Sequence, residues 1–383
     1  MIRVGFRVIG GAAWQGGRNY LWNLLYAITA QSDRRVHPVL LHAPDEDPGD
    51  LVMPGVERVV TGALLDSRYA RLAGRVAKLA LRRNPVEHHW LRRANIDVVS
   101  HAAPVGGRIP TIAWIPDVQH RRLPQLASHR EQLIRDHLFR EILRDAAIVV
   151  TSSEAARDDL HEFFAADLAK CRVLRFVSQP RLAPDKMLSF RELRAKFALP
   201  ERYVHLPNQL WKHKNHALVI EALRLAPDVV VIATGPRDDY RHAGFYDELM
   251  GVVSAYGLGE RFRHLGLVSF PELISLMHHS VAVVNPSRFE GWSTTVEEAK
   301  SLGKRVLVSD IAVHREQAPP RASYFPVDDA HALARYLREA WDSHDPVVDA
   351  RASAAAAAAL PARTRAFAET YETIVLDVVR QNR

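Results

Sequence analysis

The stretch from Val284 to Gly303 reads VNPSRFEGWSTTVEEAKSLG, and it decides how the second half of the chain folds. The apolar run Val281–Val284 predicts a buried strand, which the turn-forming residues that follow bring to an end. From Glu290 onward the pattern favours a helix that ends at Gly303, a natural C-cap. Arg305–Ser309 is apolar again, so the stretch predicts a strand, a loop, a helix and a second strand in succession.

Two carboxylates in this stretch, Glu290 and Glu298, are candidates for binding a ligand. A helix N-terminus presents unpaired N–H groups and partial positive charge, so it suits an anionic ligand, and Gly291 lets such a ligand approach the backbone. Glu290 lies at the mouth of the loop, and Glu298, about two turns further on, can accept hydrogen bonds from sugar hydroxyls. A first-turn acid that complements the helix dipole and a solvated surface acid explain the same pair.

The whole string resembles the retaining family-4 glycosyltransferases, whose hallmark is P-S-x-x-E-G-[FW]-x-x-x-x-x-E-A. The matching positions are Pro286, Ser287, Glu290, Gly291, Trp292, Glu298 and Ala299. The resemblance implies that Glu298 holds the ribose of a nucleotide-sugar donor and that Glu290 lies near the transferred sugar. Where the family usually has Gly-Leu-Pro, this chain has Ser293, Thr294 and Thr295, whose hydroxyls can cap the helix or meet a phosphate.

Length and composition predict a cytoplasmic protein of two domains. The chain has 383 residues, and single cores rarely grow past about 250–300 residues. The single cysteine, Cys171, excludes a disulfide framework and a cysteine zinc site, and it fits a reducing compartment. No apolar run reaches the ~20 residues that span a bilayer, and the N-terminus lacks a signal-peptide core.

The net charge of +7 favours anionic partners, which include nucleotides, lipid head groups and nucleic acid. Zinc-finger spacings and the aromatic-basic interleaving of single-strand binders are both missing from the sequence, so we expect no nucleic-acid partner. The segment Asp66–Asn84 suggests a membrane surface instead. Its apolar side chains alternate at helical spacing beside a basic stripe made of Arg68, Arg71, Arg75, Lys78 and Arg82. A solvated basic face over an ordinary core stripe is the alternative interpretation.

The N-terminal half predicts a parallel sheet covered on both faces. Arg3–Ile9 is a strand, followed by glycines and by a helix from about Arg18. Further strands are expected at Val36–Leu41, Ile96–Ser100, Thr111–Ile115, Ala147–Thr151 and Arg172–Val177. By resemblance, the Gly16-Gly17 turn faces the donor diphosphate or the acceptor, although glycines that only supply turn geometry would look the same.

Loops at the carboxyl ends of strands line the ligand site of open α/β sheets, which makes Asp117 and His120 candidate catalytic residues. Family members often carry His-Asp here. If Asp117 aligns with that Asp, Pro116 occupies the histidine position and His120 has to substitute. A turn Asp and a surface His are the alternative. His101, after the strand Ile96–Ser100, is a weaker candidate of the same kind.

The C-terminal half predicts a second Rossmann-like sheet, after a linker near Gln179–Lys186. Its strands are expected at Tyr203–Leu206, Val229–Ala233, Arg261–His264, Val281–Val284, Arg305–Ser309 and Ser323–Pro326. In the first strand–helix loop, Lys212 and Lys214 stand where a diphosphate meets a helix N-terminus. The family places an Arg and a Lys here. Lys214 fits the Lys, whereas the Arg position holds Asn208, so Lys212 supplies the second charge or Asn208 donates neutral hydrogen bonds.

The resemblance implies an α/β fold of the GT-B type, with two Rossmann-like domains facing across a cleft. We expect an acceptor-side domain at residues 1–180, a donor-binding domain at 181–358, and a helix at 359–383 that crosses back to the first domain. The implied enzyme is a metal-independent, retaining glycosyltransferase that needs no cofactor. It moves a sugar from a nucleoside-diphosphate sugar to a glycan or lipid-linked acceptor in polysaccharide or lipopolysaccharide assembly. A catalytically silent sugar-nucleotide-binding protein and a sugar-nucleotide epimerase are the alternatives.

Overall fold

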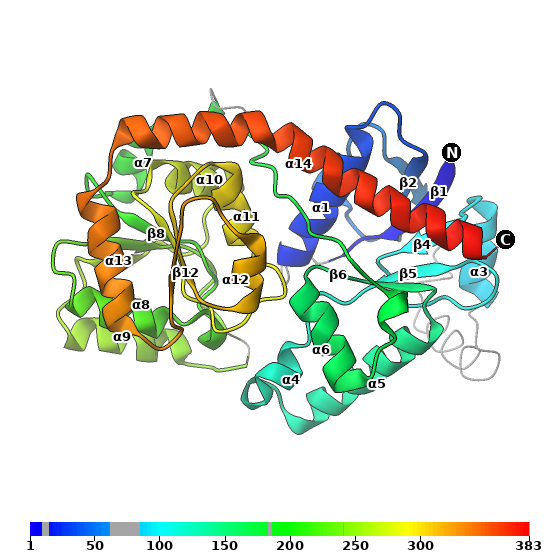
Figure 1. Cartoon of the computed structure of the whole chain (residues 1–383), viewed down its shortest axis with the longest axis horizontal. Coiled ribbons are helices and arrows are strands. Elements are labelled where there is room, and N and C mark those ends of the chain that lie inside the picture. The colour runs from blue at the N-terminus through cyan, green and yellow to red at the C-terminus, as the bar shows by residue number, and fades with distance from the viewer. Residues whose placement is uncertain (10–14, 62–84, 183–185, 240, 383) are drawn as a thin grey trace. The chain divides into compact units, whose positions relative to one another are not determined.

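A computed structural model describes residues 1–9, 15–61, 85–182, 186–239 and 241–382. The chain forms two compact units, one made of residues 1–177 and 362–383 and the other of residues 178–361. Each unit is a parallel β-sheet with helices packed on it (Figure 1). The basic and apolar stripe expected in Asp66–Asn84 lies outside the described residues, as do Gly10 and Gly11.

The first unit contains a seven-stranded sheet in the order β3-β2-β1-β4-β5-β6-β7. Its strands are β1 (Ile2–Arg7), β2 (Val36–His42), β3 (Glu57–Val60), β4 (Val98–Ser100), β5 (Thr111–Trp114), β6 (Ile148–Thr151) and β7 (Cys171–Val173). Its described helices are α1 (Gln15–Thr29), α3 (Pro85–Arg93), α4 (Gln119–Arg122), α5 (His129–Asp145) and α6 (Glu154–Phe164). All the pairings are parallel, as the alternation of apolar runs and helical segments predicts.

Two sequence-based expectations for this unit need correction. Helix α1 begins at Gln15, so Gly16 and Gly17 lie in its first turn and not in a turn before it. Gly17 is buried there. Strand β3 was not predicted, because its four residues are only half buried and carry two charges.

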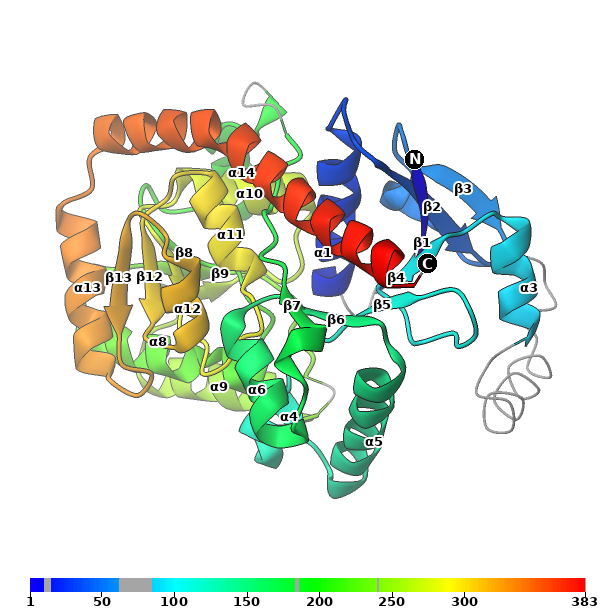
Figure 2. The same cartoon turned by 45° about the vertical axis from the view of Figure 1, so that its right-hand side comes forward.

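The second unit contains a six-stranded sheet in the order β10-β9-β8-β11-β12-β13. Its strands are β8 (Val204–Leu206), β9 (Val231–Ala233), β10 (Phe262–His264), β11 (Val283–Asn285), β12 (Val306–Ser309) and β13 (Ala322–Phe325). Its helices are α7 (Phe190–Phe197), α8 (His216–Arg224), α9 (Phe245–Ala255), α10 (Phe270–His279), α11 (Thr294–Ser301), α12 (Ala312–Gln317) and α13 (Ala330–Asp342). Helices α8, α9 and α13 bury their apolar faces on one side of the sheet, and α10 and α11 on the other (Figure 2).

The stretch around Glu290 folds as its sequence predicts. Strand β11, helix α11 and strand β12 follow one another, and β11 pairs with β12 in parallel. Helix α11 ends just before Gly303, whose φ of +70° is the left-handed conformation of a C-cap glycine. The segment from β11 through α11 to β12 therefore positions Glu290 and Glu298.

One long helix, α14 (Pro346–Gln381), belongs to both units. Its first part, to Pro361, lies in the second unit and includes the alanine-rich tract of residues 354–359. Its second part buries Phe367, Tyr371 and Val375 in the first unit, where the Tyr371 hydroxyl donates to Ser100 Oγ at 2.7 Å. No helix in the described ranges of the chain has both the length and the apolar character to cross a membrane.

Replacing Gly303 tests how the start of α14 is fixed. We expect Gly303→Ala to lower the free energy of unfolding by about 2–4 kcal/mol, because the residue would keep a left-handed φ and its Cβ would collide with the carbonyl of Ala352. Urea unfolding measures the change. Gly251→Ala, inside α9 with open space around the new Cβ, is the control and should stabilise by about 0.5–1 kcal/mol. A similar stability for both variants would contradict this role of Gly303.

Candidate active site

The candidate site of the second unit is built from the loops that follow β8 and β11. These two strands are neighbours in the sheet, so their carboxyl ends carry adjacent loops. The loops meet in an ion pair, in which Lys214 Nζ lies 2.6 Å from Glu290 Oε1. Two residues that the sequence marked separately as catalytic candidates are therefore in direct contact.

The electrostatics of the pair favour a charged carboxylate. Burial raises the pKa of Glu290, but Lys214 and the hydroxyl of Ser287 stabilise the ionised form more strongly, so the pKa lies below its ordinary value. Both side chains are largely shielded from solvent. Removing either partner would leave a buried charge uncompensated.

Asn285, at the end of β11, is the hub of hydrogen bonds that holds the two loops together. It is fully buried, and its Oδ1 accepts from Ser287 Oγ at 2.7 Å and from Asn208 Nδ2 at 3.4 Å. Its Nδ2 donates to Ser293 Oγ at 2.6 Å. The sequence marked Asn285 only as a residue that ends a strand, because its partners lie in other elements.

Asn208 and Thr295 make the second tie between the loops. Thr295 Oγ1 lies 3.1 Å from both the carbonyl of Pro207 and Asn208 Oδ1. Asn208 stands where the resemblance expects an arginine, and here its amide is used inside the protein. Asn208 thus donates to Asn285 and accepts from Thr295, and its hydrogen bonding to a diphosphate stays a prediction.

Helix α11 presents a capped N-terminus next to the ion pair. Ser293 is its N-cap, and its hydroxyl accepts from the backbone N–H of Val296 at 3.3 Å. The Gln317 side chain also hydrogen-bonds to the backbone of Ser293, and its Nε2 donates to the Ser293 carbonyl at 2.9 Å. Gly291 is buried, whereas Trp292 and Thr294 are half buried beside this end of the helix. The capping alternative for Ser293 is confirmed.

Glu298 is a buried carboxyl that has no hydrogen-bond partner for its side chain among the described residues. It is 4% exposed. Burial raises its pKa to about 8, although the charge of Arg181 opposes the shift. With this pKa the carboxyl is mostly protonated at neutral pH, so it can both donate and accept hydrogen bonds, which suits a ligand that offers hydroxyl groups.

A clamp that the sequence did not predict fixes the turn that carries Lys214. The buried Asp239 accepts from the backbone N–H of Lys212 at 3.2 Å and pairs with Arg241 at 3.1 Å. The Arg241 guanidinium lies 4.7 Å from the Trp211 ring centroid. Lys212 itself is exposed, and its neighbour His213 is buried, which lowers the pKa of that histidine to about 3.

The candidates in the first unit have a different setting. Asp117 is half buried, and its Oδ1 accepts from the backbone N–H of Gln119 at 2.9 Å, as in an Asx turn. His120 is buried with its Nε2 3.0 Å from Asp136 Oδ1, and its ring lies 5.3 Å from that of Phe139. Burial lowers the pKa of His120 despite Asp136, so the imidazole is neutral. The alternative of a surface histidine is wrong, and a catalytic role for either residue stays a prediction.

His101, the weaker candidate, is buried with a positive φ of +56° at the end of β4. Tyr20 Oη lies 2.7 Å from its Nε2, and Ser100 Oγ lies 2.8 Å from its Nδ1. Burial lowers the pKa of His101 to about 3. The strained backbone and the two hydrogen-bonded ring nitrogens place His101 in a rigid, buried hydrogen-bond network.

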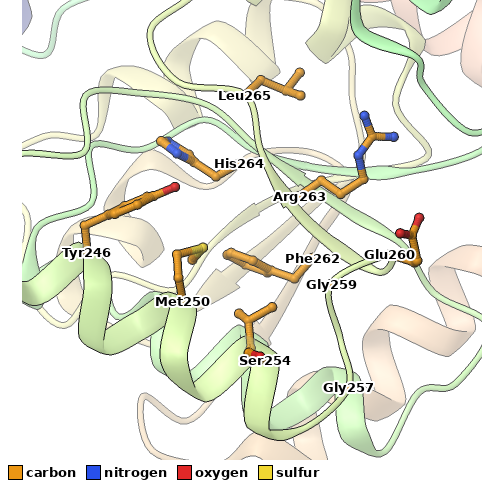
Figure 3. A pocket seen from close by; sticks show the side chains of 11 residues that line it. Tyr246, Met250, Ser254, Gly257, Gly259, Glu260, Phe262, Arg263, His264 and Leu265 are labelled. Atoms are coloured by element: carbon orange, nitrogen blue, oxygen red, sulfur yellow. The ribbon is translucent and has the colours of Figure 1, made fainter.

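A cavity of about 660 Å³ lies at the edge strand β10, where Met250 of α9 faces Phe262 (Figure 3). Near its upper end in this view, His264 bonds through Nε2 to the carbonyl of Gly235 at 2.9 Å. Gly235 follows β9 with a φ of +136°, and a Cβ there would collide with Asn208. The cavity is therefore linked to the site by these loops, but neither Lys214 nor Glu298 lines it.

Comparison with known proteins gives the fold class. Sucrose-phosphate synthase from Thermosynechococcus elongatus matches 100% of this chain with 99% of its own, at a TM-score of 0.68 and 17% identity. HepE of Anabaena, in complex with UDP and glucose, matches 100% of this chain with 98% of its own, at a TM-score of 0.66 and 16% identity. WaaG, a glycosyltransferase involved in lipopolysaccharide biosynthesis, matches 97% of this chain with 95% of its own, at a TM-score of 0.58 and 14% identity.

The two parallel sheets and these neighbours define the GT-B fold, the class that the sequence predicted. The model of the family described as glycosyl transferases group 1 matches residues 189–358. That segment contains the whole candidate site of the second unit, and it is the part of the chain that is similar to the group 1 glycosyl transferases. The curated proteins contain no match to its sequence.

The pKa of Glu298 predicts a pH-dependent stability. A folded-state pKa of about 8 against an ordinary 4.5 means that the folded protein binds more protons between these pH values, so Glu298 destabilises the fold as pH rises through this window. We expect Glu298→Gln to melt several degrees above the wild type at about pH 9 and at the same temperature near pH 4.5. Differential scanning fluorimetry measures this. Glu201→Gln, at an exposed position, should follow the wild type, and equal melting of Glu298→Gln and wild type at about pH 9 would refute the buried, unpaired carboxyl.

Proposed function

We propose that the chain transfers a sugar, with retention of configuration, from a nucleoside-diphosphate sugar to a hydroxyl of a glycan or lipid-linked acceptor. Assembly of a cell-envelope polysaccharide is the proposed setting. The observation that carries the proposal is the buried Glu298 carboxyl, unpaired within the described residues, on the helix that begins beside the Lys214–Glu290 pair. HepE, whose structures hold UDP and UDP-glucose, and WaaG, which is involved in lipopolysaccharide biosynthesis, support the donor and the setting.

Glu298 is the proposed anchor for the donor ribose. Its carboxyl is buried at a desolvation cost that raises its pKa, and hydroxyl donors from a ligand would offset that cost. Two neighbouring ribose hydroxyls match the two oxygens of one carboxylate. Because such donors favour the ionised form, donor binding should lower the pKa of Glu298 and release a proton near pH 7.

Lys214 is the proposed group that stabilises the departing diphosphate. Its ammonium is already held at the N-terminal side of α11, where Glu290 fixes it at 2.6 Å. Negative charge that develops on the leaving phosphate would meet this ammonium, the exposed Lys212 and the positive end of the α11 dipole. We propose that these groups act without a metal ion.

Glu290 is the proposed residue next to the transferred sugar. As an ionised carboxylate it can orient sugar hydroxyls while it keeps Lys214 in place. In the proposed retaining reaction the acceptor hydroxyl attacks on the face that the diphosphate leaves, and the departing phosphate accepts the proton. The acceptor would be held by the first unit, and Asp117 is the candidate there. A peripheral position on the inner face of the membrane, with a cytoplasmic location, completes the proposal.

Neutralising Lys214 tests the chemistry. We expect Lys214→Ala to lower kcat by about 100-fold or more, because the leaving charge loses its closest cation, while KM for the donor changes much less. Steady-state release of the nucleoside diphosphate in the presence of acceptor measures both parameters. Lys196→Ala is the matched control, since this surface lysine pairs with Glu272 away from the two loops and should leave turnover unchanged. Unchanged turnover in Lys214→Ala would refute the assignment.

A panel of uridine and guanosine sugars separates transfer from the alternatives. We expect one donor to raise the melting temperature, and Glu298→Ala to abolish this shift, because only a ligand of the folded state stabilises it. A silent binding protein would show the shift without release of diphosphate, and an epimerase would convert the sugar with its diphosphate still attached. Either result would overturn the proposed transfer.

A further inference from the structure

Helix α12 adds the end of a third strand to the candidate site. It follows β12, the strand next to β11, and it lies beside α11 (Figure 2). Its Gln317 side chain bonds to the backbone of Ser293, the N-cap of α11. His314 lies three residues before Gln317, so the two side chains share one face of α12. That face is therefore turned to the segment that contains Glu290 and Ser293.

The His314 ring is fixed to the end of β12. Its Nδ1 lies 2.8 Å from the carbonyl oxygen of Ser309 and 3.2 Å from Ser309 Oγ. The Ser309 hydroxyl itself donates to the carbonyl of Ser287 at 2.5 Å. Ser287 is the residue whose hydroxyl helps to lower the pKa of Glu290. His314 is thus connected through two serines to the loop that follows β11.

The tautomer of His314 follows from these contacts. A carbonyl oxygen can only accept a hydrogen bond, so Nδ1 carries the proton and donates to Ser309. The residue is 0% exposed, and this burial lowers the pKa of the imidazole, which is therefore neutral. In a neutral ring with its proton on Nδ1, Nε2 is a hydrogen-bond acceptor. That acceptor is buried and has no hydrogen-bond partner among the described residues.

The charges around His314 indicate what this acceptor can bind. Glu290 raises the pKa of the imidazole and Lys214 lowers it, so both members of the ion pair act on the ring. Asp310 acts on it as well, but its carboxylate already pairs with Arg315 at 2.6 Å. A nitrogen lone pair repels a carboxylate and attracts an ammonium group. Lys214 is therefore the partner that suits Nε2.

We propose that His314 Nε2 is a second hydrogen-bond acceptor for the Lys214 ammonium, used when the bond between Lys214 and Glu290 opens. An ammonium group has three donors, and the bond of 2.6 Å to Glu290 uses one of them. A carboxylate offsets the charge of Lys214, whereas a neutral imidazole holds the side chain and leaves its positive charge for a phosphate. His314 is thus a positioning residue that acts through Lys214. The inference rests on the proposed function only for its effect on turnover.

NMR of the nitrogen atoms in the histidine rings tests the inference without a sugar donor. His314→Asn identifies the His314 signals by their loss. In the wild type we expect a protonated Nδ1 and an unbonded Nε2. In Glu290→Ala, which frees Lys214, the Nε2 signal should move to that of a hydrogen-bonded nitrogen, and Lys214→Met in the same chain should reverse the change. A protonated Nε2 in the wild type, or an Nε2 signal that Glu290→Ala leaves unchanged, would overturn the inference.

Turnover provides a second test, which holds even if Glu290→Ala does not fold. His314→Asn keeps a donor for Ser309 but loses the acceptor, so we expect kcat to fall by about tenfold while KM for the donor changes little. His314→Gln, whose amide oxygen can take the place of Nε2, should recover most of this loss. In a Lys214→Ala background His314→Asn should have no further effect, whereas a merely structural role would lower turnover in both backgrounds.

The matched control is His278→Asn. His278 also buries a ring nitrogen that has no partner in the described part of the chain, but its carbonyl accepts from Lys304, before the opposite end of β12, at 3.0 Å. This variant should keep the kcat of the wild type. Wild-type kcat in His314→Asn, or equal losses in the two backgrounds, would refute the role of His314. A wild type that transfers no sugar would overturn the proposed function, and the NMR result would still decide the inference.

Discussion

The ion pair between Lys214 and Glu290 is the contact on which the candidate site depends. It exists because β8 and β11 are adjacent parallel strands, so loops that are 76 residues apart in the chain leave the sheet side by side. A buried ion pair gains little over apolar packing for stability, but losing one partner leaves an unpaired charge. Asn285, Asn208 and Thr295 hold the two loops in register around it. The site thus forms because the strand order brings the two loops together, and neither loop would form it alone.

The sequence predicted what depends on local pattern. Apolar runs marked every strand of the second sheet to within two or three residues, and Gly303 marked the end of α11. Lys214 and Glu290 were identified from their position in loops that follow strands, and Glu298 from the resemblance of the string around Glu290. The similarity to the group 1 glycosyl transferases was visible in the string around Glu290, and it is confirmed; the narrower retaining mechanism stays a prediction.

The sequence alone did not show which residues the polar side chains hydrogen-bond to. His120 looked like a surface or ligand-binding histidine, yet Asp136, 16 residues later, and Phe139 enclose it. Asp239 and Arg241 carried no motif, because their role consists of bonds to the backbone and ring of another loop. Helix α1 was expected three residues late, since glycines favour turns in general and only buried packing shows that Gly17 belongs to the helix.

Helix α14 affects the order in which the two units can fold during synthesis. The first unit is discontinuous, and residues 178–361 are translated before the segment that supplies Phe367, Tyr371 and Val375 to its core. A nascent chain can therefore finish the second unit while the first still lacks a packing partner for Ser100 and its neighbours. Until that segment has left the ribosome, the part of the first unit that packs against Phe367, Tyr371 and Val375 lacks its cover.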